Sequence, residues 1–151
     1  MLITESDKND FKDILELQKL SYQQEAQIYN DYNIPPLKQT YDEILNDYDK
    51  MIILKAIEDN RIIGSVRAYE NNNSCYIGRL IVHPNFQNKG IGTKLMNKME
   101  DKFTSVNRYE LFTGYKSNKN LYLYKRLGYK EYKRENLSDS VIIVYLEKEK
   151  K

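Results

Sequence analysis

The chain has 151 residues, the length of one domain, and combines 40% hydrophobic with 30% charged side chains. This balance is typical of a globular domain and excludes a disordered, collagen-like or coiled-coil chain. A single cysteine excludes an internal disulfide, and with only one histidine beside it a zinc site of the usual Cys/His kind is excluded as well. We therefore expect one domain over residues 1–151 and no metal site.

Charge is spread unevenly along the chain. Residues 1–50 carry a net charge of −6 and residues 51–151 a net charge of +8. No basic groove-reading helix, zinc finger or RNA-binding aromatic strand occurs, so we expect no nucleic-acid partner. No apolar run approaches the roughly 20 residues of a membrane span, and the first residues lack a signal-peptide pattern. We expect no membrane partner and a cytoplasmic location.

The first third of the chain predicts one short strand and two helices. Met1 to Thr4 is typical of an edge strand. A helix is expected from Asp7 to Tyr29, with hydrophobic and amide side chains along one side: Phe11, Ile14, Leu15, Gln18 and Tyr22. Pro35-Pro36 predicts a loop, and Thr40 with Glu43 forms a capping box for a second helix ending near Tyr48.

The hydrophobic period then changes to that of strands. Three strands with short turns predict an antiparallel meander, and two helices and three further strands follow. The ranges are strands at 51–58, 61–70, 75–83, 108–113, 129–135 and 141–146, and helices at 91–103 and 118–127, the last stopped by Gly128. The predicted fold class is a mixed α/β (α+β) sheet of about seven strands with about four helices packed on both faces.

The most informative segment follows the third meander strand. Val82-His83-Pro84 leads into Gln87-x-x-Gly90-x-Gly92, which opens a helix. Glycines allow a ligand to approach the backbone closely, and the unpaired N–H groups of a helix start attract an anion. A Walker loop is absent, and Leu95 stands where a dinucleotide fingerprint has its third glycine.

This segment resembles the acetyl-CoA loop of the GNAT superfamily of N-acetyltransferases. A second segment, Ser117 to Tyr129, resembles the late helix of the same family, and the matching positions are Leu123, Tyr124, Gly128 and Tyr129. Ser117 stands where the family usually has Asn, and Asn118 is the neighbouring amide. The resemblance covers nearly the whole chain and implies a GNAT-like, mostly antiparallel sheet.

The resemblance also implies an activity. A primary amine would attack the thioester of acetyl-CoA directly, and Tyr124 would protonate the leaving thiolate. The amine acceptor would be a small molecule or a protein N-terminus, and a homodimer remains open. The residues expected to bind acetyl-CoA are Leu80, Ile81, Val82, Gln87, Asn88, Lys89, Gly90, Ile91, Gly92, Thr93, Ser117 and Asn118.

The general base is not evident from the sequence. Some members of the family place a Glu where this chain has Tyr76, so a water relay or another carboxylate such as Glu70 is implied. Tyr76 and Ser117 also leave open an alternative, a non-catalytic acetyl-CoA-binding sensor or regulatory module.

Five residues are candidates for binding the acceptor. Tyr22, Glu25 and Tyr29, with the Pro35-Pro36 loop, fall in the variable acceptor region of such a fold. Arg67 and Arg79 lie on predicted strands, where an exposed position is the favoured interpretation. If either pointed into the cleft, it would favour an amine that carries a carboxylate.

Overall fold

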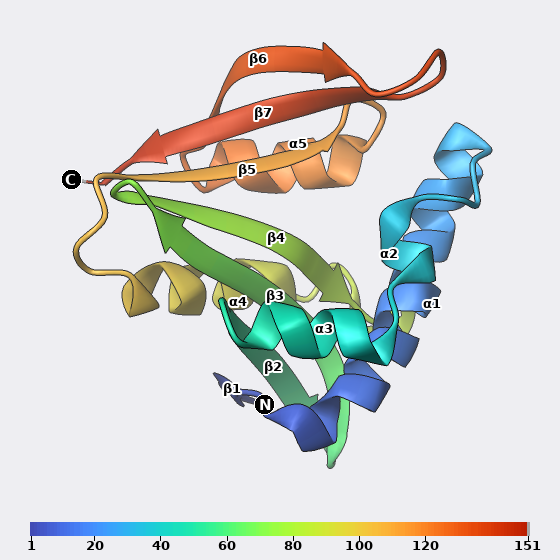
Figure 1. Cartoon of the computed structure of the whole chain (residues 1–151), viewed down its shortest axis with the longest axis vertical. Helices are drawn as coiled ribbons and strands as arrows, with labels where there is room; N and C mark the ends of the chain where they lie inside the picture. Colours follow the sequence, from blue (N-terminus) through green and yellow to red (C-terminus); the bar gives the residue numbers. More distant parts are fainter. Residues whose placement is uncertain (151) are drawn as a thin grey trace.

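Seven strands form one mixed sheet in a computed structural model that describes residues 1–150. The spatial order is β1-β2-β3-β4-β5-β7-β6, and β4 with β5 is the parallel pair among antiparallel neighbours (Figure 1). The strands are β1 (Leu2–Glu5), β2 (Ile52–Glu58), β3 (Arg61–Asn71), β4 (Ser74–Val82), β5 (Arg108–Gly114), β6 (Lys130–Asn136) and β7 (Ile142–Glu149). The predicted fold class is confirmed, because the sheet is mixed and mostly antiparallel.

Five α-helices accompany the sheet, one more than the sequence predicts. They are α1 (Phe11–Tyr29), α2 (Pro35–Lys38), α3 (Tyr41–Tyr48), α4 (Ile91–Lys102) and α5 (Asn118–Arg126). The additional helix is α2, so the prediction of a loop at Pro35-Pro36 is wrong. Proline lacks only an N–H that a first helical turn leaves unpaired, and its fixed φ suits that position. The capping box is confirmed, since Glu43 N donates to Thr40 Oγ1 at 3.2 Å and Thr40 N to Glu43 Oε1 at 2.9 Å.

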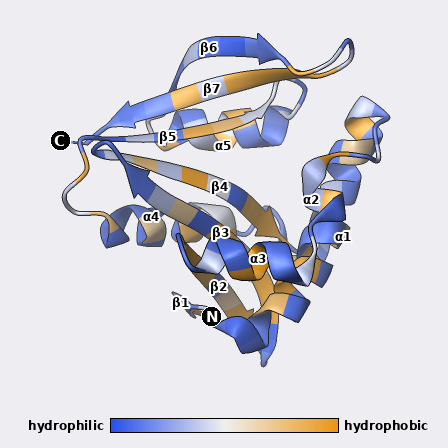
Figure 2. Ribbon diagram, viewed as in Figure 1, coloured by the Kyte–Doolittle hydropathy of each residue, from blue (hydrophilic) through white to orange (hydrophobic). Residues whose placement is uncertain are grey.

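The helices cover both faces of the sheet, as expected. Helices α1 and α3 pack on one face around Phe11, Ile14 and Ile53, while α4 and α5 contribute to the larger core on the other face with Leu95, Met99 and other residues. Strand β6 contributes no buried residue and is almost wholly hydrophilic in Figure 2. Its charged side chains suit an edge strand, because charge discourages pairing with another chain. No helix within residues 1–150 is both long and apolar enough to cross a membrane.

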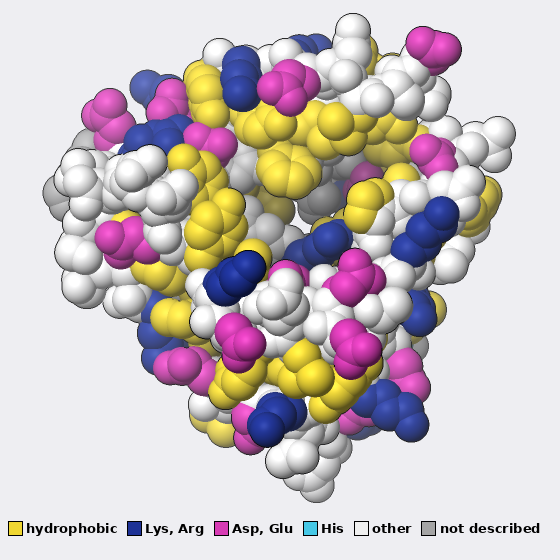
Figure 3. All heavy atoms as spheres, viewed as in Figure 1, with side chains coloured by type: hydrophobic (Ala, Val, Ile, Leu, Met, Phe, Trp, Pro, Cys, Tyr) yellow, Lys and Arg dark blue, Asp and Glu magenta, His cyan; other side chains and the backbone are white. Residues whose placement is uncertain are grey.

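Strands β4 and β5 pair over a short distance and then separate. Their register runs from Ser74 opposite Arg108 to Tyr76 opposite Glu110, although both strands continue beyond these pairs. The gap widens toward the C-terminal ends of both strands (Figure 1). The space-filling view is hollowed between the two strands (Figure 3). We call this opening the wedge.

A β-bulge lies on the β4 side of the wedge. Gly78 pairs with Arg67 and Ile81 with Ser65, so Arg79 and Leu80 together face the single residue Val66 of β3. Arg79 has a φ of +51°, which is uncommon for a residue with a side chain. A bulge of this kind leaves one residue without its ladder hydrogen bonds and redirects a side chain.

Arg67 is buried beneath α1 and α3 rather than exposed, so the favoured sequence interpretation is wrong for this residue. Only 2% of its surface is accessible. Its Nη2 donates to Gln18 Oε1 at 2.6 Å, and its Nη1 donates to Gln39 Oε1 at 2.8 Å and to Asp47 Oδ2 at 3.1 Å. Burial, followed by repulsion from Arg79, lowers the pKa of Arg67 to about 10, and Asp47 opposes that shift. Arg67 therefore stays charged at neutral pH and ties α1 and α3 to β3.

The end of β5 is in contact with the last turn of α1. A Cβ atom added at Gly114 would lie 2.0 Å from the Tyr29 hydroxyl, so only glycine allows the ring to cross the strand there. The Tyr29 hydroxyl accepts a hydrogen bond from Lys116 N at 2.7 Å. Helix α1 thus spans from its β3 contacts to the loop after β5.

Gly114→Ala should therefore destabilise the fold by about 1–3 kcal/mol, because overpacking displaces the Tyr29 ring. Gly78→Ala is a matched control, since a Cβ at Gly78 meets nothing within 4 Å, and it should change stability by less than about 1 kcal/mol. Urea unfolding of both variants measures the difference. Equal unfolding midpoints would contradict the packing that we assign to Tyr29.

Candidate active site

The turn after β4 brings the backbone into position for α4. His83 Nδ1 accepts a hydrogen bond from Asn85 N at 3.1 Å, so the single imidazole stabilises this turn. Asn88 and Gly90 then adopt left-handed conformations, with φ of +63° and +81°. Gly90 is the N-cap of α4 and supplies no side-chain cap, so the first N–H groups of the helix lack a capping partner.

The predicted cofactor-binding residues of this region are contiguous in space as well as in sequence. Leu80–Val82 form the end of β4, and Gln87–Thr93 form the loop and first turn of α4. Gln87 Nε2 donates to Val82 O at 3.2 Å, which ties the loop back to the strand. With Lys89 and Lys94 nearby, the helix start can accept an anion such as a phosphate group.

Gly92 has a packing role that sequence reasoning missed. A Cβ atom at this position would lie 3.3 Å from Leu123 Cδ2 of α5 and 3.8 Å from Leu80 Cδ2. The missing side chain therefore allows α5 to approach α4, in addition to exposing the backbone. A substitution at Gly92 acts on both features.

Helix α5 places a buried tyrosine, Tyr124, close to Tyr22 and Glu25 of α1. Tyr124 is 6% exposed, and its ring lies 6.1 Å from that of Tyr129. Burial raises the pKa of Tyr124 above its usual value, and the neighbouring Tyr22 and Glu25 raise it further. The Tyr124 hydroxyl therefore keeps its proton at neutral pH. By contrast, Tyr122 is 66% exposed on another side of the helix.

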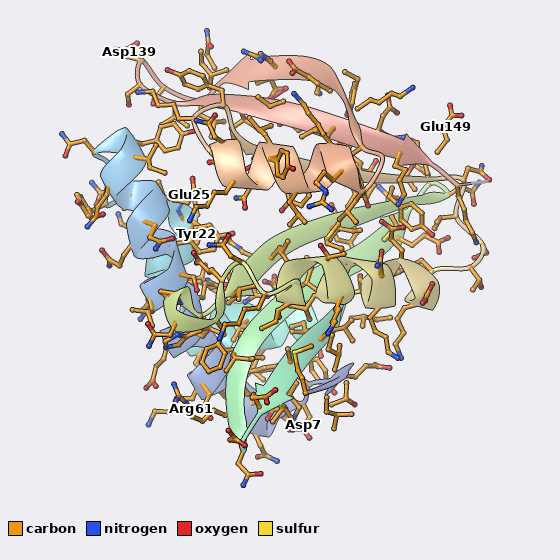
Figure 4. All side chains as sticks on the ribbon, turned by 180° about the vertical axis from the view of Figure 1, so that it is seen from behind. Asp7, Tyr22, Glu25, Arg61, Asp139 and Glu149 are labelled. Carbon is orange, nitrogen blue, oxygen red and sulfur yellow. The ribbon has the colours of Figure 1, made fainter. Side chains whose placement is uncertain are left out.

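Two α1 residues complete this side of the wedge. Tyr22 and Glu25 are three residues apart, hence on one helix face, and in Figure 4 they extend from α1 toward the interior. Ser117, 2% exposed, donates its hydroxyl proton to Glu25 Oε2 at 2.5 Å. Glu25 therefore links α1 to the loop after β5, and Asn118 begins α5 as an exposed residue.

The five acceptor candidates do not all lie together. Tyr22 lies close to both Glu25 and Arg79, as their electrostatic effects on its hydroxyl indicate. Tyr29 instead packs across Gly114, and Arg67 lies in the layer between β3 and the helices. No pattern in the sequence indicated Gly114 or the bond between Glu25 and Ser117.

Tyr76 and Glu70 lie where β4 is still paired with both β3 and β5, before the wedge opens. Tyr76 stacks on Tyr69 at 5.2 Å between ring centroids, where β4 and β5 are still paired. Glu70 is exposed and faces Cys75 near the start of β4, at the opposite end from the bulge. The carboxylate that the fold brings to Tyr124 is that of Glu25.

Aromatic side chains border the narrow end of the wedge, on the sheet face that α4 and α5 leave open. Besides the stacked Tyr69 and Tyr76, Phe112 of β5 lies 5.7 Å from the ring of Tyr145 and is 58% exposed. Hydrophobic surface lines this part of the molecule in Figure 3. An apolar group bound here would rest on these rings.

Comparison with solved structures finds the same fold over nearly the full chain. The chain matches smu.2055 from Streptococcus mutans UA159 with a TM-score of 0.85 at 15% identity, covering 99% of both chains. It matches the ribosomal-protein-S18-alanine N-acetyltransferase from Escherichia coli with a TM-score of 0.80 at 11% identity, covering 98% of this chain and 92% of the other. It matches the PaiA N-acetyltransferase from Thermoplasma acidophilum, in complex with coenzyme A, with a TM-score of 0.77 at 20% identity, covering 99% and 100%.

A search among curated protein sequences finds no match. The profile of the acetyltransferase (GNAT) family, however, matches residues 11–129, which include α1, the β4–α4 loop and Tyr124. This range is well over half of the chain, and the resemblance inferred from the loop and the late helix is confirmed. The chain belongs to the GNAT family of acetyltransferases.

Proposed function

We propose that the protein is an N-acetyltransferase that moves the acetyl group of acetyl-CoA directly to a primary amine of a small molecule or a protein N-terminus. One observation carries this proposal. The uncapped start of α4 and the protonated, buried Tyr124 lie on two helices that Gly92 and Leu123 bring into contact. An anion-binding site and a proton donor therefore serve the same opening.

The β4 end and the β4–α4 loop would hold the cosubstrate. The N–H groups from Asn88 to Thr93 would donate hydrogen bonds to the pyrophosphate of acetyl-CoA. The free edge of Leu80–Val82 would pair with the extended pantetheine arm as it would with an added strand. The structure of the Thermoplasma PaiA N-acetyltransferase with coenzyme A supports this choice of ligand. Asn118 is exposed beside this region, whereas the Ser117 hydroxyl is bonded to Glu25.

Substitution of Gly92 tests the cofactor site. Gly92→Asp should weaken acetyl-CoA binding by about tenfold or more, because a carboxylate at a helix start repels a phosphate. Gly92→Ala is the matched control: it adds the same Cβ near Leu123 without charge and should weaken binding much less. Calorimetric titration of both variants measures the affinity. Equal losses would assign the effect to helix packing and contradict an anion site.

The proposed chemistry is direct transfer. Deprotonating an alkylamine of pKa near 10.4 at pH 7 costs about 4.6 kcal/mol, so a carboxylate or an ordered water must take that proton. The amine nitrogen then forms a bond to the thioester carbonyl carbon, and the carbon–sulfur bond breaks. The Tyr124 hydroxyl donates its proton to the departing sulfur, and the proton that the new amide nitrogen loses returns to the Tyr124 phenolate, directly or through water. The N–H freed by the bulge at Arg79 and Leu80 is available to the carbonyl oxygen.

Removal of the Tyr124 hydroxyl should slow turnover. Tyr124→Phe keeps the buried ring but deletes the proton donor, so kcat should fall by about 100-fold while acetyl-CoA affinity changes less than about twofold. The control is Tyr122→Phe on the exposed side of the same helix, which should leave kcat unchanged. Steady-state release of free CoA thiol measures both. Unchanged turnover in Tyr124→Phe would remove this residue from the acid role.

A non-catalytic acetyl-CoA sensor is the second candidate. Two features favour the sensor. Tyr76 stands at the position where some family members carry a glutamate, and the Ser117 hydroxyl is already bonded to Glu25. A panel of primary amines, followed by free CoA thiol release, separates the two functions. A sensor would bind acetyl-CoA but would release no free CoA thiol with any amine of the panel, whatever the chemical class of that amine.

A further inference from the structure

We infer that the acceptor is a small aminocarboxylate, an amine that carries a carboxylate close to the reacting nitrogen, with Arg79 binding the carboxylate and Glu25 the ammonium form of the amine. The inference rests on the proposed acetyl transfer and names the class of acceptor. It depends on two opposite charges, those of Arg79 and Glu25, that both lie close to the Tyr22 hydroxyl, and Tyr22 and Glu25 in turn lie close to Tyr124.

Arg79 is held at the wedge by an unusual backbone. The β4 bulge gives it a φ of +51° and places it next to Gly78, the cross-strand partner of Arg67. Its side chain is half-buried, and within residues 1–150 it forms no ion pair. A strained conformation that directs a half-buried charge toward an opening is often associated with a bound ligand.

The positive charge close to Arg79 favours the binding of an anion there. The neighbouring Arg67 is buried and is already charged, and its own partners are Asp47, Gln18 and Gln39. Burial lowers the pKa of Arg67, and repulsion from Arg79 lowers it further. Arg67 Nε is also buried without a hydrogen-bond partner within the described chain. A carboxylate bound at Arg79 would offset this repulsion.

Glu25 supplies the opposite charge near Tyr22. Glu25 Oε2 accepts a hydrogen bond from the Ser117 hydroxyl at 2.5 Å. The other carboxylate oxygen of Glu25 can accept further hydrogen bonds. Burial raises the pKa of Tyr22, and Arg79 and Glu25 then act on it in opposite directions. A cation and an anion therefore both lie close to the Tyr22 hydroxyl. A zwitterion with its two charges reversed matches this arrangement.

The same arrangement disfavours a diamine. The negative charge of residues 1–50 would attract any cationic acceptor to this side of the molecule. A second ammonium group near the bulge, however, would be repelled by Arg79 and Arg67. The negative charge of residues 1–50 would attract the ammonium group of an aminocarboxylate, and Arg79 would orient its carboxylate. The side chain of the acceptor could then lie toward Phe112 and Tyr76.

Matched acceptors test the inference with the full-length protein. Phenylalanine, phenylalaninamide and phenethylamine share an aromatic side chain and a primary amine, but only the first carries a carboxylate. With saturating acetyl-CoA, thiol release should give a kcat/KM for phenylalanine about 10- to 100-fold above that of the other two, as expected for a charge-assisted bond. Two further pairs of acceptors repeat the comparison for polar side chains: glutamate against its α-amide, and lysine against cadaverine. In each pair only the first acceptor carries the α-carboxylate.

Variants assign the effect to its residues. Arg79→Gln should abolish the preference for the carboxylate by lowering kcat/KM for phenylalanine to the level of the amide and the amine, and Arg79→Lys should restore part of it. Glu25→Gln retains an oxygen for Ser117 and should raise KM for all three acceptors. Arg134→Gln, on the exposed edge strand β6, is the control and should change none of these values.

The outcomes separate the inference from the proposed function. Equal transfer to acids, amides and amines by the unaltered protein overturns the aminocarboxylate inference and leaves the acetyltransferase proposal standing. An equal loss for all acceptors in Arg79→Gln, with an unchanged unfolding midpoint, overturns the carboxylate role of Arg79. Acetyl-CoA binding with no transfer to any amine overturns the proposed function and the inference together.

Discussion

Strands β4 and β5 lose their mutual hydrogen bonds after the pair Tyr76 and Glu110, and the rest of the structure is arranged around that loss. Backbone groups on a strand edge need partners, and a long unpaired edge invites association with another chain. Here the two edges diverge instead of meeting another strand. The opening is compatible with an extended ligand that supplies the missing bonds to β4.

Helix α1 spans the opening that the sheet leaves. Near its middle, Gln18 receives a hydrogen bond from Arg67 of β3, and near its end Tyr29 crosses Gly114 and binds Lys116 N. These contacts connect the two separated halves of the sheet through one rigid helix. Tyr22 and Glu25 lie on the helix between the two attachments, which fixes their positions relative to Tyr124 on α5.

Local signals in the sequence were reliable where the physics is local. The capping box at Thr40, the helix start after Gly90 and the stop at Gly128 are recognisable in the sequence, because each depends on a few consecutive residues. The Pro35-Pro36 segment was misassigned because two prolines are compatible with a loop and with a first helical turn alike. Arg67 was assigned to the surface because a buried charge depends on partners that are 20 to 49 residues away in sequence.

The amino-acid sequence alone is enough to predict about seven strands in their order along the chain, the helix that follows Gly90 and the family to which the chain belongs. Hydrophobic periodicity and glycine placement act over a few residues, so they can be read without knowledge of the fold. Which charges face the wedge depends instead on the three-dimensional arrangement of the strands and helices. Overall composition indicates an acidic first third suited to a cation, whereas the β4 bulge brings Arg79 to the wedge, close to the buried Arg67. Electrostatic interactions depend on distance in space and on burial, and neither is encoded in the spacing of residues along the chain.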